Sequence, residues 1–424
     1  MTLMLPLVLA LIGGLSQFLA GGPTGSLAQS PATIGEQLLQ EPAVKTAIDR
    51  VRRDEPQVIE EQVRICEIPA PPFKETARAE AYRQAFVALG LKNVRIDKVG
   101  NVLGERPGLA ARPHLVFSAH LDTVFPEGTN VKTSRSGSII KGPGIGDDCR
   151  GLAVVLAVIR RMNDAGIQTP GTITFVGTVG EEGLGDLRGV KHLFNDELKG
   201  RIDKFVSVDG TGLGITHVAV GSMRYRVTFK GPGGHSYGAF GIANPAHALG
   251  RAIAKIAELQ VPREPKTTFS VGRVGGGTSV NSIPFEAWME VDMRSADQAA
   301  LTALDASFHK AVDRALAEEN ERWSNNGRLM VEKNVVGNRP GGRAPADAPI
   351  LQAALSVSKA LGLNARVDEG STDSNIPLSL GIPAVTIDGG GTGSGAHALE
   401  ETFDVTNSWH GTARALLLAI ALAR

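Results

Sequence analysis

The stretch Leu115-Val-Phe-Ser-Ala-His120-Leu-Asp122-Thr-Val-Phe125 joins a short apolar run to two side chains that can serve a metal site. Its first three residues are branched or aromatic, which is typical of a buried strand in a parallel sheet. His120 and Asp122 follow that run almost directly. The stretch therefore predicts a strand that ends at a functional site, because open α/β sheets bind ligands beyond the carboxyl ends of their strands.

Three further apolar runs are bounded by turn residues in the same way: Thr172–Val176, Phe205–Val208 and Ala384–Ile387. Between the runs lie patterns with helical spacing, such as Leu152, Val155, Leu156 and Ile159. Alternating strands and helices predict an α/β sheet with helices on both of its faces.

Acidic residues and histidines recur just after these runs or at glycine-rich turns. The segments are His120-Leu-Asp122, Asp147-Asp148, Glu181-Glu182, Asp209 and Ala396-His397. Two histidines and three carboxylates can hold two divalent metal ions, and Glu181 is then left to activate a water molecule. The combination predicts a hydrolase with two metal ions.

Each segment also has a structural alternative. Asp147 follows a glycine-rich turn where a helix is expected to begin, which favours an anion, but either it or Asp148 could be a plain N-cap. Asp122 suits the role of orienting a metal-bound His120. Repulsion within Glu181-Glu182 favours one metal-bound and one basic carboxylate, although acidic pairs also occur in solvated loops.

Residues 221–336 have a different pattern. Met223, Tyr225, Val227 and Phe229 alternate with polar residues, as in a half-exposed strand. The whole segment predicts the order β-α-β-β-α-β, a ferredoxin-like α+β arrangement. We expect it to be inserted into the α/β domain, which would comprise residues 29–220 and 337–424.

The inserted segment carries three further candidates. His235 lies in Gly231-Pro-Gly-Gly-His-Ser236 and suits oxyanion stabilisation or substrate binding, or alternatively a structural loop. Asn281 is a second polar candidate. Arg294 could bind a substrate carboxylate through two hydrogen bonds, or form a surface salt bridge.

The composition limits the class of protein. The 424 residues favour two domains, and Lys+Arg and Asp+Glu both number 44. No basic tract is present, which argues against a nucleic-acid partner. An apolar N-terminus with Ser26-Leu27-Ala28 predicts a signal peptide over residues 1–28 and export to the periplasm or medium. An uncleaved anchor or a misassigned start is the alternative, and pairing of Cys66 with Cys149 stays open.

The motifs together resemble the co-catalytic zinc metallopeptidases that include peptidase T, glutamate carboxypeptidase, aminoacylase and succinyl-diaminopimelate desuccinylase. The matching segments are His-Leu-Asp-Thr-Val-Phe at 120–125, Gly-Asp-Asp at 146–148, Glu-Glu-Gly at 181–183, Val-Asp-Gly at 208–210, Gly-Gly-His-Ser at 233–236 and Ala-His at 396–397. Glu-Glu-Gly-Leu-Gly-Asp at 181–186 and Ser-Thr-Asp-Ser-Asn at 371–375 look most like the peptidase T-like branch.

The resemblance implies a mixed-sheet catalytic domain and roles for its residues. Asp147 would bridge two Zn²⁺ ions, with Co²⁺ or Mn²⁺ as alternatives. His120 and Asp209 would complete one site, and Glu182 and His397 the other. Glu181 would be the general base and Asp122 would orient His120.

The resemblance also implies a cis Asp147–Asp148 peptide and a homodimer through residues 221–336, in which His235 reaches the active site of the partner. The expected substrates are small di- and tripeptides with a free amine. Asp373 is the candidate partner of that amine, and Asn375 in the same segment is a further candidate for substrate binding. An N-acyl-amino-acid deacylase or a carboxypeptidase on the same site is the alternative. A non-catalytic binding protein is disfavoured because Glu181 and the ligands are intact.

Overall fold

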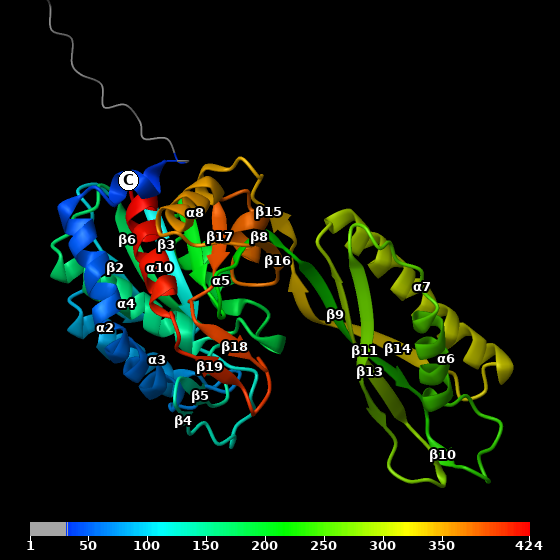
Figure 1. Ribbon diagram of the computed structural model, residues 1–424. Helices are drawn as coiled ribbons and strands as arrows, with labels where there is room; N and C mark the ends of the chain where they lie inside the picture. Colours follow the sequence, from blue (N-terminus) through cyan, green and yellow to red (C-terminus); the bar gives the residue numbers. More distant parts are fainter. Residues whose placement is uncertain (1–30, 32) are drawn as a thin grey trace, which may run out of the picture.

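The computed structural model describes residue 31 and residues 33–424, so the predicted signal peptide lies outside the described residues. The chain forms two lobes joined by a narrow junction (Figure 1). The larger lobe is built on a nine-stranded mixed sheet. Its strands, in spatial order, are β1 (Lys92–Ile96), β2 (Val102–Arg106), β6 (Thr172–Thr178), β3 (His114–His120), β7 (Lys204–Val208), β17 (Ala384–Ile387), β8 (Ile215–Ala219) and β15 (Gly342–Arg343), with β16 (Val367–Gly370) also paired to β8.

The four apolar runs of the sequence form the centre of this sheet. Strands β6, β3, β7 and β17 are mutually parallel, and β3 pairs with both β6 and β7. All seven residues of β3 are buried. The prediction of buried parallel strands is therefore confirmed, and the carboxyl ends of these strands meet at one edge of the sheet.

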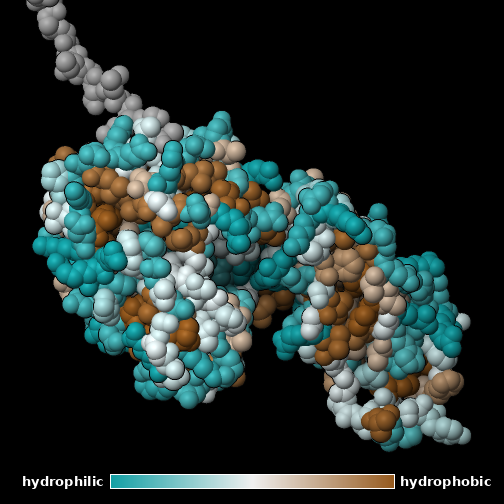
Figure 2. Space-filling model, in the orientation of Figure 1, coloured by the Kyte–Doolittle hydropathy of each residue, from teal (hydrophilic) through white to brown (hydrophobic). Residues whose placement is uncertain are grey.

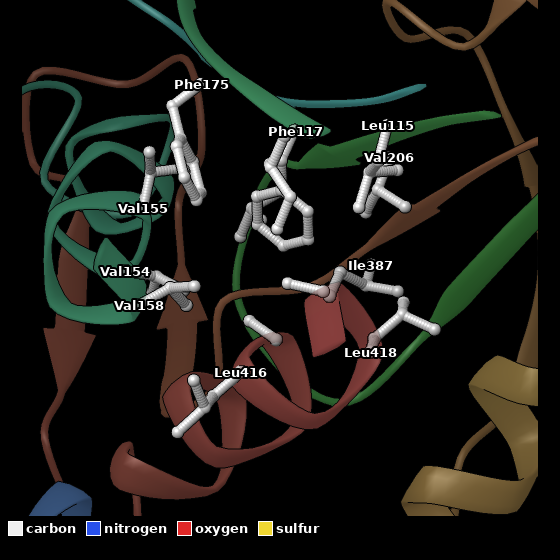
Figure 3. Packing of buried hydrophobic residues seen from close by; sticks show 14 of the residues in the cluster. Leu115, Phe117, Val154, Val155, Val158, Phe175, Val206, Ile387, Leu416 and Leu418 are labelled. Carbon is white, nitrogen blue, oxygen red and sulfur yellow. The ribbon is translucent and has the colours of Figure 1, made fainter. Parts of the chain in front are cut away.

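Helices cover both faces of the sheet, as predicted. One face carries α2 (Pro42–Cys66), α4 (Cys149–Asp164) and α10 (Trp409–Leu422), flanked by α1 (Ile34–Leu38), α3 (Thr76–Ala88) and α8 (Pro349–Ala360). Figure 3 shows Phe175 of the sheet beside Val155 of α4, and Phe117 between this helix and α10, which carries Leu416 and Leu418. Each such side chain contributes about 1.5–3 kcal/mol when it leaves water.

The opposite face packs against shorter elements. These are α5 (Arg188–His192), which follows the 3₁₀ turn η1 (Gly183–Gly185), the π-helix η2 (Leu193–Glu197) directly after α5, and α9 (Asn375–Ser379). Within the described residues no helix is long and apolar enough to cross a bilayer. The apolar C-terminal helix α10 is instead buried against the sheet, as expected for a core helix.

The smaller lobe is an antiparallel four-stranded sheet with the order β11-β13-β9-β14. Its strands are β9 (Gly221–Lys230), β11 (Thr267–Gly276), β13 (Glu286–Ser295) and β14 (Met330–Arg339). Helices α6 (Pro245–Ala257) and α7 (Gln298–Arg322) cover one face (Figure 1). The predicted ferredoxin-like order is observed. Strand β14 extends three residues past the expected boundary at 336, to Arg339.

A small sheet that the sequence analysis did not predict lies beside the larger one. It has the order β18 (Thr392–Ser394), β19 (Thr402–Asp404), β5 (Ile139–Lys141) and β4 (Ser134–Ser136). The loop with His397 connects β18 to β19, and the turn with Asp147 follows β5. Pairing of β19 with β5 thus brings two predicted ligands from distant parts of the sequence to one place. The short pair β10 (Gly234–His235) and β12 (Ser282–Ile283) completes the smaller lobe.

Candidate metal centre and active site

The five predicted metal ligands converge at the carboxyl edge of the central strands. Nε2 of His120 lies 3.0 Å from Oδ1 of Asp147 and 3.8 Å from Oδ1 of Asp209. Nε2 of His397 lies 3.2 Å from Oδ2 of Asp147 and 3.0 Å from Oε1 of Glu182. Asp147 therefore sits between the two histidines, with one oxygen directed at each.

The donor set of this cluster fits divalent metal ions. His120, Asp147 and Glu182 offer ligand atoms within 4.8 Å of one another, and so do His120, Asp148 and Asp209. Burial and the neighbouring carboxylates raise the pKa of Asp209 well above its usual range, although the adjacent His120 opposes this. A cation would relieve that crowding of negative charge, and imidazole and carboxylate ligands suit Zn²⁺.

The structure separates the roles of the two adjacent aspartates. Asp148 caps α4: its Oδ1 accepts a hydrogen bond from the N–H of Gly151 and its Oδ2 one from the N–H of His120. Its oxygens are thus occupied by the main chain, whereas those of Asp147 face the two histidines. We therefore assign Asp147 as the ligand and Asp148 as the N-cap. The peptide between them is cis, as the resemblance implied.

Asp122 acts differently from the prediction. We expected its carboxylate to orient His120, but the carboxylate accepts hydrogen bonds from the N–H groups of Glu181, at 3.1 Å, and Glu182, at 2.9 Å. Nδ1 of His120 lies 3.0 Å from the main-chain oxygen of Asp122 and 3.8 Å from its Oδ1. The imidazole ring of His120 is therefore held by the main chain of Asp122. The fully buried carboxylate of Asp122 instead binds the main chain of Glu181 and Glu182.

Glu181 is a buried carboxylate beside the cluster, only 5% exposed. Burial raises its pKa to about 8, opposed by Arg339 and reinforced by Glu182. Nη1 of Arg339 lies 3.1 Å from Oε1 of Glu181, and Nη2 donates to the main-chain oxygen of the same residue. A carboxylate with a pKa near neutrality suits proton transfer at physiological pH.

Two residues of the site were missed from the sequence. Arg339 lies in Asn338-Arg-Pro-Gly-Gly342, which matches none of the motifs considered. Glu401 accepts hydrogen bonds from the N–H groups of Gly144, Gly146 and Asp147, at 2.8–3.0 Å, and so holds the turn that carries Asp147. Burial raises the pKa of Glu401 to about 7 in spite of these bonds. The only signal for Glu401 was its nearness to His397 in the sequence.

The predicted substrate-binding role of Asn375 is wrong. This residue is fully buried, and its Nδ2 donates to the main-chain oxygens of Val220, at 2.9 Å, and Pro340, at 3.0 Å. Its Oδ1 accepts from the N–H of Thr372. Both amide donors are therefore used to hold together the two chain segments that join the lobes.

Asp373 is not open to a substrate amine in this structure. It is 1% exposed, and its Oδ2 accepts a hydrogen bond of 2.5 Å from the hydroxyl of Thr178. Oδ1 has no partner among the described residues. Burial raises the pKa of Asp373 to about 6. The predicted contact with a free amine is not supported, because the carboxylate lies behind the strand end rather than on an open surface.

Two candidates in the smaller lobe, His235 and Asn281, are not brought to the metal cluster within one chain. His235 is exposed on β10, at the far end of that lobe (Figure 1). Its Nδ1 accepts from the N–H groups of Tyr237 and Gly238, which leaves Nε2 free to bind. Asn281 adjoins the same loop through a hydrogen bond from the N–H of Ser236.

Arg294 forms the salt bridge that was its structural alternative. Its Nε lies 2.7 Å from Oδ2 of Asp292, and Oδ1 of Asp292 lies 2.8 Å from Nε of Arg224. The two cysteines, Cys66 and Cys149, are both free and buried in one small cluster, so the structure contains no disulfide between them.

Comparison with known proteins agrees with this geometry. The model of peptidase family M20/M25/M40 matches residues 116–421. A cytosol non-specific dipeptidase of Escherichia coli (strain K12) is 26% identical over 289 residues, which cover 61% of this chain and 58% of the dipeptidase. A succinyl-diaminopimelate desuccinylase of Azoarcus sp. (strain BH72) is 29% identical over 269 residues, which cover 58% of this chain and 70% of the desuccinylase.

The fold is also that of a known structure. A crystal structure of a tripeptidase from Staphylococcus aureus subsp. aureus Mu50 superposes with a TM-score of 0.71 and 24% identity, covering 87% of this chain and 99% of the tripeptidase. The E. coli dipeptidase, by contrast, is matched over less than two thirds of its length.

Proposed function

Because the chain belongs to peptidase family M20/M25/M40, we propose that it hydrolyses amide bonds in small peptides with the help of two bound divalent metal ions. The observation that carries this proposal is the position of Asp147 between His120 and His397, with Glu181 buried alongside. The names of the relatives, a dipeptidase and a tripeptidase, support small peptides as the substrate class.

The ligands divide into two sets that share Asp147. His120 and Asp209 would hold one ion, and Glu182 and His397 the other. When bound, two such ions lower the pKa of a water molecule and polarise the amide carbonyl. We propose Zn²⁺ as the native metal, and the same nitrogen and oxygen donors also accept Co²⁺ or Mn²⁺.

The remaining residues supply proton transfer and positioning. Glu181 takes the proton of the attacking water and then donates it to the leaving amine. Burial raises the pKa of Glu181, and two bound cations nearby would favour the carboxylate form that accepts this proton. Asp122 keeps Glu181 and Glu182 in place through their N–H groups. Arg294 remains our candidate for binding the substrate carboxylate. Its salt bridge to Asp292 uses Nε, so its two terminal nitrogens can donate to a substrate carboxylate.

We also propose a homodimer through residues 221–336, in which His235 of one chain stabilises the oxyanion in the other. Tyr237, Phe240, Val280 and Phe285 are exposed beside His235 at the end of the smaller lobe. Figure 2 shows further hydrophobic surface along this lobe. Exposed hydrophobic side chains that gather in this way are typical of an interaction surface. We further propose that residues 1–28 direct export of the protein.

Hydrolysis of a panel of di- and tripeptides and N-acyl amino acids tests the proposal. The protein would be assayed after chelation and again after Zn²⁺ or Co²⁺ is restored. Metal-dependent cleavage of free-amine peptides supports the proposed function. Cleavage confined to N-acyl substrates would favour a deacylase instead, the alternative that the similarity to a desuccinylase supports. If the protein with two metal ions bound cleaves none of these substrates, both the peptidase and the deacylase function are contradicted.

A further inference from the structure

We propose that Arg339 is a positioning residue that holds the carboxylate of Glu181 from the junction between the two lobes. The inference rests on the proposed function, in which Glu181 transfers the proton. It assigns a role to a residue that belongs to none of the sequence motifs of the site, and it makes the placement of Glu181 depend on the smaller lobe.

Arg339 holds Glu181 at two points. Nη1 lies 3.1 Å from Oε1 of the side chain, and Nη2 donates to the main-chain oxygen of the same residue. Nη1 also donates to the hydroxyl of Ser371, at 3.1 Å. Two contacts from one planar guanidinium fix both the backbone and the side-chain rotamer of Glu181. Oε1 is engaged in this way, which leaves Oε2 for the proton of the attacking water.

Arg339 is itself only 4% exposed, and it is the last residue of β14. The chain returns there from the smaller lobe to the larger one. Arg339 pairs in register with Ser222, just after the point where the chain enters the smaller lobe. Asn375 binds the main chain on both sides of the junction, at Val220 and Pro340. Arg339 therefore extends from a fixed junction rather than from a flexible surface loop.

The same junction holds the rest of the loop that follows Glu181. The N–H of Asn338 donates to Oδ1 of Asp186, at 2.8 Å, and Nζ of Lys191 donates to the main-chain oxygen of Asn338, at 3.0 Å. Nη1 of Arg224 donates to the main-chain oxygen of Gly183, at 2.6 Å. Rotation of the smaller lobe about the junction would therefore change the geometry of Glu181, and Arg339 is the contact that reaches its side chain.

Kinetics of Arg339→Ala and Arg339→Lys test the inference, on a peptide that the wild-type protein cleaves. Lys191→Met is the matched control, because Lys191 joins the same strand end to the same loop without touching Glu181. Metal content and thermal stability are measured for every variant. For Arg339→Ala we expect both metals to remain, kcat to fall about tenfold or more, and KM to change little.

Arg339→Lys should recover only part of the kcat lost in Arg339→Ala. The ammonium group of Lys cannot make both contacts that the planar guanidinium makes with Glu181. Free guanidinium ion, far below the concentrations that unfold proteins, should raise kcat of Arg339→Ala but not of Glu181→Ala. A purely structural role would not produce this rescue. Lys191→Met should keep a kcat close to that of the wild type.

Three results would overturn the inference. They are an unchanged kcat in Arg339→Ala, a loss of activity that follows loss of metal, and an equal loss in Lys191→Met. If the metal-loaded wild type cleaves nothing, the proposed function fails and this inference fails with it. An active wild type with an unaffected Arg339→Ala variant contradicts this inference alone.

Discussion

Oδ1 of Asp147 lies 3.0 Å from Nε2 of His120, although the two residues are 27 positions apart in the sequence. The contact exists because β3 ends at His120 while the turn that carries Asp147 is anchored by Glu401, on the other side of the site. The other oxygen of Asp147 faces His397. One carboxylate thus connects the two halves of the proposed metal centre.

Replacing Asp147 with Asn should therefore remove metal from the protein. An amide offers one weak oxygen ligand in place of the two carboxylate oxygens that face the histidines. Asp148→Asn is the control, because Asp148 caps α4 and should change stability, within about 2 kcal/mol, more than metal content. Metal analysis together with thermal unfolding checks the pair. The assignment would be reversed if Asp148→Asn lost metal while Asp147→Asn kept it.

Glu181→Gln should keep both metals and lose about 10²- to 10⁴-fold in kcat, because Gln has a similar shape but cannot accept a proton. Turnover of small peptides and metal content are measured on the same samples. A metal-loaded variant with wild-type turnover would show that another group is the base.

Asp373→Asn should change how stability depends on pH in the metal-free protein. The folded-state pKa of Asp373 is raised to about 6, above its unfolded value of about 4. Between these pH values the carboxyl is protonated in the folded state and ionised in the unfolded state. Unfolding then releases a proton between these values, and the wild type loses stability as pH rises from about 4 to 6. Asn carries no charge at any pH. The variant should therefore gain stability relative to the wild type across this window.

Thermal unfolding of both chelated proteins at several pH values measures the effect. Both proteins carry Glu181→Gln, because the charge of Asp373 contributes to the raised pKa of Glu181. Glu401 contributes equally to both, so the difference reports on Asp373. A stability difference between the two proteins that stays constant with pH would contradict a raised pKa for Asp373.

Arg150→Met should destabilise the fold strongly. The Arg150 side chain is fully buried, donates to the main-chain oxygens of Gly389 and Ser408, and lies 2.9 Å from Glu55. Its removal leaves the Glu55 carboxylate buried without a counter-charge, which costs about 3–5 kcal/mol. Denaturant unfolding measures the loss. Adding Glu55→Gln should recover part of it, and strict additivity of the two changes would argue against the ion pair.

The sequence predicted the elements and ligands whose signals are local. Apolar runs such as Leu115–Phe117 and the alternation around Tyr225 reflect burial directly, and both were correct. Arg339 and Glu401 were missed because their roles arise from tertiary contacts: each reaches the site only after distant strands have paired. Asn375 was misassigned for the same reason, since its partners Val220 and Pro340 belong to the inserted lobe's junction.

The position of His235 leads to the last prediction. In one chain it lies at the end of the smaller lobe remote from the junction, so it can serve an active site only in a second copy of the chain. Mixing His235→Ala protein with Glu181→Ala protein tests this directly. In a mixed dimer, the site with an intact Glu181 receives an intact His235 from its partner and regains function. The other site lacks its base and stays inactive. Subunit exchange followed by peptide assay should therefore restore activity that neither variant has alone. If His235 acted within its own chain, every site in the mixture would lack one of the two groups and no activity would return.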